Sequence, residues 1–148
     1  MSALKYSNAL PSALEFRTLR NSTGWGDISL TDAKCSLENS LCTVTAREPD
    51  GELVAVARAI GDGVLNIYIQ DVIVTPSFRK QGVGRQTVEH LLKEIKAFAP
   101  AECTVGLMAA FGQDRFYERL GFTARPTNTL GAGFTASLQT LANSSLRA

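Results

Sequence analysis

The chain has 148 residues, of which 45% are hydrophobic and 20% charged, a balance typical of one compact globular domain. The formal net charge is +1, so the chain has no overall positive field that would attract nucleic acid or an anionic membrane, and we expect neither as a partner. Three scattered cysteines and one histidine exclude a disulfide framework and a multi-histidine metal site, and we expect no metal. We find no leader-like start and no apolar run approaching about 20 residues, so we expect a cytoplasmic protein without a membrane span.

The first 40 residues favour two helices. Ser12 and Glu15 have the spacing of a capping box, which predicts a helix beginning at that point. A second short helix is expected from about Asp32 to Glu38. The run Gly24-Trp25-Gly26-Asp27 interrupts the helical pattern between them.

Three β-rich runs follow, and turn signals separate them. The runs cover residues 42–46, 53–60 and 64–74, with Asp50-Gly51 and Asp62-Gly63 in the intervening turns. Because tight turns join antiparallel neighbours, these runs predict an antiparallel meander.

Beyond residue 75 helical and strand patterns alternate. The expected elements are an amphipathic helix ending before Pro100, a strand over 104–108, a helix over 113–120 capped by Gly121, and strands over 122–125 and 134–138. The expected order is therefore α-α-β-β-β-α-β-α-β-β. We expect residues 1–148 to form a single α/β domain with a mixed, mostly antiparallel central sheet flanked by helices.

A basic loop with two glycines connects the longest strand to the amphipathic helix. Its residues are Arg79, Lys80, Gln81, Gly82, Val83, Gly84 and Arg85. Backbone N–H groups at a helix N-terminus, glycines without a Cβ and arginine side chains all suit a pyrophosphate. The loop lacks the Gly-Lys-Ser/Thr end of a Walker loop and the third glycine of a dinucleotide fingerprint, since Thr87 stands there. The alternative is a solvated basic turn.

Two motifs in this region resemble those of one family. Arg79-Lys80-Gln81-Gly82-Val83-Gly84 matches the Q/R-x-x-G-x-G/A signature of the GCN5-related N-acetyltransferases (GNAT), and Phe116-Tyr117-Glu118-Arg119-Leu120-Gly121-Phe122 resembles their F-Y-x-x-L-G-F segment. The resemblance covers roughly residues 53–122. It implies the GNAT fold and an N-acetyltransferase that moves the acetyl group of acetyl-CoA to a primary amine by direct attack in a ternary complex. Family members frequently dimerise, so a homodimer is expected.

The resemblance also implies how the coenzyme is held. The loop residues Arg79 to Arg85 would bind the coenzyme A pyrophosphate. Val72, Ile73 and Val74 would pair with pantetheine through their backbone, at a bulge where the strand separates from its neighbour. A backbone N–H there would polarise the thioester carbonyl. Many members have an asparagine where this chain has Ala110, and alanine cannot bond to the coenzyme in the same way.

Two side chains are the candidates for proton transfer. Tyr117 matches the usual general acid of the family, which protonates the thiolate leaving group, and the alternative is an aromatic core residue. An ordinary alkylamine is almost entirely protonated at neutral pH, so a base is wanted as well. Asp71 is the only carboxylate on its strand near the loop. It could accept the proton, bind the ammonium, or make a structural bond near the bulge.

The sequence says least about the pocket that would bind the acceptor amine. In the family the segment between the first two helices commonly lines it, so Trp25 could stack on the acceptor and Asp27 could attract its cation. Trp25 could equally be a helix-packing anchor. The acceptor is a small-molecule amine or a protein lysine or N-terminus. A second reading, a non-catalytic acyl-CoA-binding sensor, is motivated by Ala110 and by the lack of an obvious base.

Overall fold

The computed structural model describes residues 3–143. Their contacts divide the chain into two compact units, Met1–Met108 and Ala109–Ala148, and each unit is described by itself. The expectation of a single domain over residues 1–148 stays a prediction.

The first unit is built on one five-stranded sheet. Its strands are β1 (Lys5–Ser7), β2 (Cys42–Arg47), β3 (Leu53–Gly61), β4 (Asn66–Val74) and β5 (Thr104–Leu107), and they lie side by side in that order. The first three neighbour pairs are antiparallel and β4 pairs with β5 in parallel. The expected mixed, mostly antiparallel sheet is therefore confirmed.

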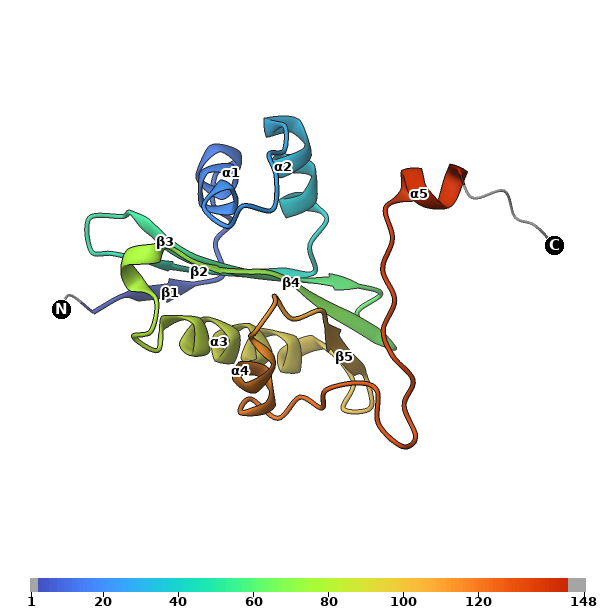
Figure 1. Cartoon of the computed structure of the whole chain (residues 1–148). Helices are drawn as coiled ribbons and strands as arrows, with labels where there is room; N and C mark the ends of the chain where they lie inside the picture. The colour runs from blue at the N-terminus through green and yellow to red at the C-terminus, as the bar shows by residue number, and fades with distance from the viewer. Residues whose placement is uncertain (1–2, 144–148) are drawn as a thin grey trace. The chain divides into compact units, whose positions relative to one another are not determined.

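Helices cover both faces of this sheet (Figure 1). The helices α1 (Ala13–Asn21) and α2 (Leu30–Glu38) lie on one face, and α3 (Val83–Phe98) lies on the other. The core under α1 and α2 consists of Phe16, Leu19, Ala33, Leu37, Val56 and Ile73. The α3 crossover explains why β4 and β5 are parallel, since a tight turn cannot connect parallel strands. Within the described residues no helix is long and apolar enough to cross a membrane.

The N-terminal segment confirms one expectation and corrects another. Ser12 Oγ accepts the Glu15 amide, and the Glu15 carboxylate accepts the Ser12 amide, so the expected capping box is present. The strand β1 was not expected from the sequence. Three residues are too few to show a period of two, and only the antiparallel pairing of Lys5–Ser7 with β2 makes them a strand.

The second unit corrects the end of the expected order. Its described residues, 109–143, contain the helices α4 (Asp114–Glu118) and α5 (Leu138–Asn143) and no strand. The strand expected over 122–125 is wrong, because local turns take its polar groups: the Phe122 amide donates to the Tyr117 carbonyl (3.1 Å). The strand expected over 134–138 is also wrong, since Ser137 Oγ accepts the Thr140 amide (3.1 Å) at the start of α5.

Candidate active site

A β-bulge interrupts the pairing of β3 with β4. Val56 lies opposite Ile73 and Arg58 opposite Gln70, so Ala57 alone faces both Asp71 and Val72. Asp71 has φ +54°, in the left-handed region that residues other than glycine seldom adopt. This extra residue changes which side chains face each side of the sheet, and it lies at the position where the sequence led us to expect a bulge.

The pairing of β4 with β5 ends before this region. The last pair of the parallel register joins Ile69 to Leu107, whereas β4 continues to Val74. Among the described residues, no strand pairs with β4 on this side beyond Ile69. Strand residues direct their N–H and C=O groups alternately to the two sides, so only alternate residues of Val72 to Val74 face this side, and the Val74 carbonyl already accepts Arg79 Nε. The remaining groups on this side can pair with an extended ligand that takes the place of a strand.

The loop after β4 leads directly into a helix N-terminus. A short 3-10 turn, η1 (Pro76–Phe78), is followed by Lys80 with φ +59° and by Gly82, the N-cap of α3, with φ +82°. No side chain caps this helix. A Cβ added at Gly82 would meet no heavy atom within 4 Å, so the space beside the first amides of α3 is open. Open N–H groups at the positive end of a helix are suited to binding an anion.

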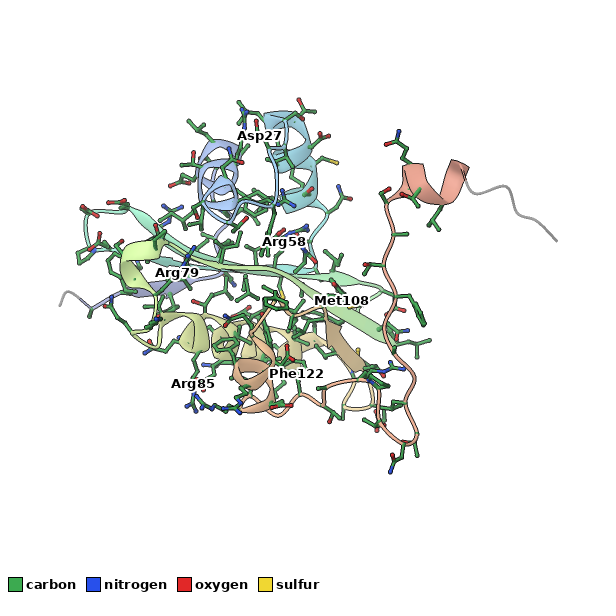
Figure 2. All side chains as sticks on the ribbon, viewed as in Figure 1. Asp27, Arg58, Arg79, Arg85, Met108 and Phe122 are labelled. Carbon is green, nitrogen blue, oxygen red and sulfur yellow. The ribbon has the colours of Figure 1, made fainter. Side chains whose placement is uncertain are left out.

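The polar side chains of the loop are partly engaged within the protein. Arg79 Nε donates to the Val74 carbonyl (2.9 Å), and Gln81 Nε2 donates to the Ser77 carbonyl (2.8 Å). Arg85 is exposed on the first turn of α3 (Figure 2). Its Nε pairs with Glu89 one turn along the helix at 2.8 Å. The backbone amides at the start of α3 are therefore the groups of this loop that remain open to a ligand, and the basic side chains add positive charge around them.

Asp71 lies beneath α1 and α2 in a cluster of arginines. Its side chain is 2% exposed; Oδ2 accepts Arg58 Nε at 2.7 Å and Oδ1 accepts Arg20 Nε at 3.4 Å. Gln70 Nε2 also donates to Oδ1 (3.3 Å). A general base must reach the proton that it takes, and both oxygens of this buried carboxylate are occupied. Of the three roles considered for Asp71, this geometry supports the structural bond at the bulge.

The segment between α1 and α2 presents an accessible tryptophan and a neutralised carboxylate. Trp25 is 46% exposed, which argues against a helix-packing anchor. Asp27 receives Arg17 Nε at 2.8 Å and Asn21 Nδ2 at 3.0 Å. The hydrogen bond from Arg17 is the main reason that the pKa of Asp27 falls well below its usual value. With its charge balanced by Arg17, Asp27 attracts an acceptor cation only weakly.

Tyr117 belongs to the second unit, on α4. Its ring is half-buried and meets the rings of Phe116 and Phe122 edge to face, with centroid distances of 4.9 and 6.1 Å. Gly121, with φ +97°, ends this segment in the left-handed conformation that the sequence predicts. The aromatic neighbours fix the orientation of the Tyr117 ring within its unit. Ala110 offers only backbone groups, and its carbonyl accepts the Gln113 amide (3.0 Å).

The arginine partners of Asp71 were not identified from the sequence. Arg58 interrupts the apolar run Leu53–Ile60, and a charged residue inside a buried strand requires a partner. That signal was present, but it does not say which of the carboxylates in the chain is the partner. Figure 2 shows Arg58 between the sheet and the α1–α2 layer, and Asp27 at the connection of these helices.

Comparison with known proteins decides the family. Residues 38–124 match the model of the acetyltransferase (GNAT) domain family. The chain belongs to the GNAT acetyltransferase family. A solved structure from methicillin-resistant Staphylococcus aureus, of unknown function and named a probable acetyltransferase, superposes with a TM-score of 0.80 at 30% identity, covering 91% of this chain and 99% of that one. The GNAT fold is thus confirmed.

Two curated relatives of this GNAT protein carry more specific names. The uncharacterized N-acetyltransferase ycf52 of Pyropia yezoensis is 29% identical over 128 residues, 84% of this chain and 72% of that protein. Serotonin N-acetyltransferase 2, chloroplastic, of Oryza sativa is 36% identical over 104 residues, 68% of this chain and 50% of that protein. The chain thus spans only half the length of the rice relative.

Proposed function

We propose that this GNAT protein transfers the acetyl group of acetyl-CoA to a primary amine in a ternary complex. The observation that carries the proposal is that three features follow one another in one segment of the chain: the bulge, the end of β4 beyond its last pair with β5, and the open N-terminus of α3. That segment offers an extended backbone edge, which suits a pantetheine arm, followed by an open helix N-terminus, which suits the diphosphate joined to that arm. The residues present therefore fit the donor.

Separate groups of the chain would bind the donor and assist the transfer. The amides at the start of α3, beside Gly82, hold the diphosphate with help from the basic side chains Arg79, Lys80 and Arg85. The backbone of Val72 to Val74 orients the pantetheine arm. Acetyl-CoA supplies a thioester, whose acetyl carbon the amine attacks. Tyr117 Oη donates a proton to the sulfur as the C–S bond breaks, the proton that the amine nitrogen loses on attack passes to water, and the phenolate regains its proton from water.

The segment between α1 and α2 indicates which kind of amine the protein would accept. Half-exposed Trp25 offers a ring face on which an aromatic or cationic amine can stack. A small arylalkylamine is therefore the first acceptor to test, and a lysine peptide is the second. The relatives include both a serotonin N-acetyltransferase of rice and a histone acetyltransferase of Glycine max, and these names describe those proteins. The expected homodimer and cytoplasmic location stay predictions.

The first test is calorimetric titration with acetyl-CoA, with ATP as the control ligand. Selective binding of acetyl-CoA is expected. Equal binding of ATP would replace the proposal with a nucleotide-phosphate site. An amine panel containing serotonin and a lysine peptide then tests transfer by the release of free thiol. Tight donor binding without transfer to any amine would favour the sensor reading, which the engaged Asp71 carboxylate and Ala110 keep open.

Replacing Tyr117 by phenylalanine tests the general acid. Loss of a positioned acid costs about 10²- to 10⁴-fold in rate, so kcat should fall by at least about 100-fold. Donor binding should remain unchanged, because the ring and its contacts with Phe116 and Phe122 are kept. An unchanged kcat in an assay limited by the chemical step would remove Tyr117 from the mechanism.

A further inference from the structure

The bulge in β4 is backbone held in an unfavourable conformation. Asp71 has φ +54°, and a non-glycine residue in the left-handed region is strained unless its surroundings determine it. Aspartate and asparagine tolerate this region better than other side chains. A regular ladder would shift the register of part of β4 by one residue and turn its buried side chains to the other face, so the packing of the sheet already opposes loss of the bulge. The strain at residue 71 itself must still be offset by an interaction of the native state.

The side chain of Asp71 supplies that interaction. Arg58 Nε reaches Oδ2 at 2.7 Å from β3, the strand that the bulge distorts. The Arg58 guanidinium also donates from Nη1 to the Ser36 carbonyl and to Ser40 Oγ, both at 3.3 Å, at the end of α2. The arginine side chain is 12% exposed, so this ion pair is shielded from water and salt.

A third element joins the same carboxylate. Arg20, near the end of α1, donates from Nε to Oδ1 of Asp71 (3.4 Å) and from Nη1 to the Gly26 carbonyl (3.3 Å). The carboxylate is therefore fixed from β3 and α1 together, and Arg58 extends the connection to α2. Removing one member of such a buried cluster leaves an uncompensated charge, so its loss should disturb the bulge more than the loss of an exposed pair.

We propose that the Asp71–Arg58–Arg20 cluster is a positioning device that holds the β4 bulge and thereby keeps the backbone of Val72 to Val74 in the conformation that receives the donor. The inference rests on the proposed use of acetyl-CoA. The three residues do not touch the reacting atoms; they act through the backbone of β4. The cluster also connects the proposed donor strand to the segment between α1 and α2, through the contact of Arg20 with the Gly26 carbonyl.

Two variants isolate the cluster, and a third is the matched control. Asp71→Asn keeps the shape and the tolerance for positive φ but removes the charge, and Arg58→Met removes the main partner. Arg47→Met removes a more exposed ion pair that also joins the sheet to α1: Arg47 binds Glu15 at 2.6 Å and ties β2 to α1 away from the β4 bulge. Thermal unfolding establishes that each variant is folded at the temperature of the measurements, and Asp71→Asn carries the test if Arg58→Met does not fold.

The first readout is amide hydrogen exchange without any ligand. The Thr75 amide donates to the Val54 carbonyl at 2.8 Å just beyond the bulge, so it reports whether the β3–β4 pairing holds. We expect its exchange to accelerate about tenfold or more in both cluster variants, relative to the change in Arg47→Met. Equal exchange in Asp71→Asn and Arg47→Met would overturn the proposal.

The second readout is the dissociation constant of acetyl-CoA from calorimetry. We expect it to rise about tenfold or more in the cluster variants and less than about threefold in Arg47→Met. Unchanged affinity in Asp71→Asn, with normal binding by the wild-type protein, would overturn the positioning role and leave the proposed function intact. If the wild-type protein does not bind acetyl-CoA, the proposed function fails, and hydrogen exchange alone decides whether the cluster holds the bulge.

Discussion

Replacing Gly82 by alanine separates the binding role of the loop from its contribution to folding. Gly82 has φ +82°, and an alanine held in this left-handed conformation costs about 1–2 kcal/mol. Steric conflict adds nothing, because an added Cβ meets no heavy atom within 4 Å. For a chain of 148 residues, that strain corresponds to a fall in Tm of about 3–6 °C.

The effect on the donor should be larger than the effect on folding. The added methyl group would occupy the open space through which a diphosphate approaches the first amides of α3. We expect the affinity for acetyl-CoA to fall at least tenfold, or about 1.4 kcal/mol, at a temperature where the variant is folded. Calorimetric titration measures the affinity, and a thermal scan measures the stability.

Gly51→Ala is the matched control for this experiment. Gly51 has φ +98° and equally open surroundings, but it lies in the turn between β2 and β3. Both variants should lose similar stability, whereas only Gly82→Ala should lose donor affinity. If Gly82→Ala binds acetyl-CoA within about twofold of the wild-type protein, the loop is a solvated turn and the reasoning about the open amides of α3 is refuted.

Two further predictions concern the α1 layer. Phe16 is 1% exposed in the core beneath α1 and α2, so Phe16→Ala should lower the free energy of unfolding by about 3–5 kcal/mol in urea denaturation; a loss below about 1 kcal/mol would contradict the assigned core. The hydrogen bond from Arg47 lowers the pKa of Glu15 to about 2. Because this folded-state pKa lies below the unfolded value, the ion pair stabilises the protein above about pH 4.5 and the stabilisation is lost as pH falls toward 2. The pair is partly exposed, so Glu15→Gln should remove only about 1 kcal/mol of this acid-dependent stability; an unchanged pH profile of unfolding would disprove it.

The sequence predicts those helices and strands that are marked by residues within or directly beside them. The three strands between residues 42 and 74 were found because Asp-Gly turns separate them and apolar residues fill them. The helix α3 was found from its apolar face. In contrast, β1 becomes a strand only by pairing with β2, and Ser137 turns an apolar run into the start of α5. Where the hydrophobic periodicity of the sequence does not distinguish helix from strand, the secondary structure is decided by pairing with another strand, as in β1, or by one capping residue, as in α5.

The same distinction applies to the candidate site. The loop from Arg79 to Arg85 is contiguous, so its motif predicts an open helix N-terminus from the sequence alone. The engagement of Asp71 with Arg58 depends on a bulge that shifts the register between β3 and β4. A sequence pattern does not contain that shift, and a carboxylate beside the loop therefore suggested a base. Tyr117 stays a prediction from its motif.

The parallel pairing of β4 with β5 has a consequence for how such a protein can diversify. Parallel neighbours need a long crossover, so β4, the loop, α3 and β5 form one unbroken stretch from residue 66 to 107. The family match begins at residue 38, where α2 ends. Mutations on the exposed side of α1 and in its connection to α2 can accumulate without altering this stretch, provided that Arg20 keeps its contact with Asp71 and that Phe16 and Leu19 keep their packing in the core with Ile73. Under the proposed function, a lineage could exchange one acceptor for another while inheriting the donor half unchanged, and a designer could do the same by grafting residues 13–38.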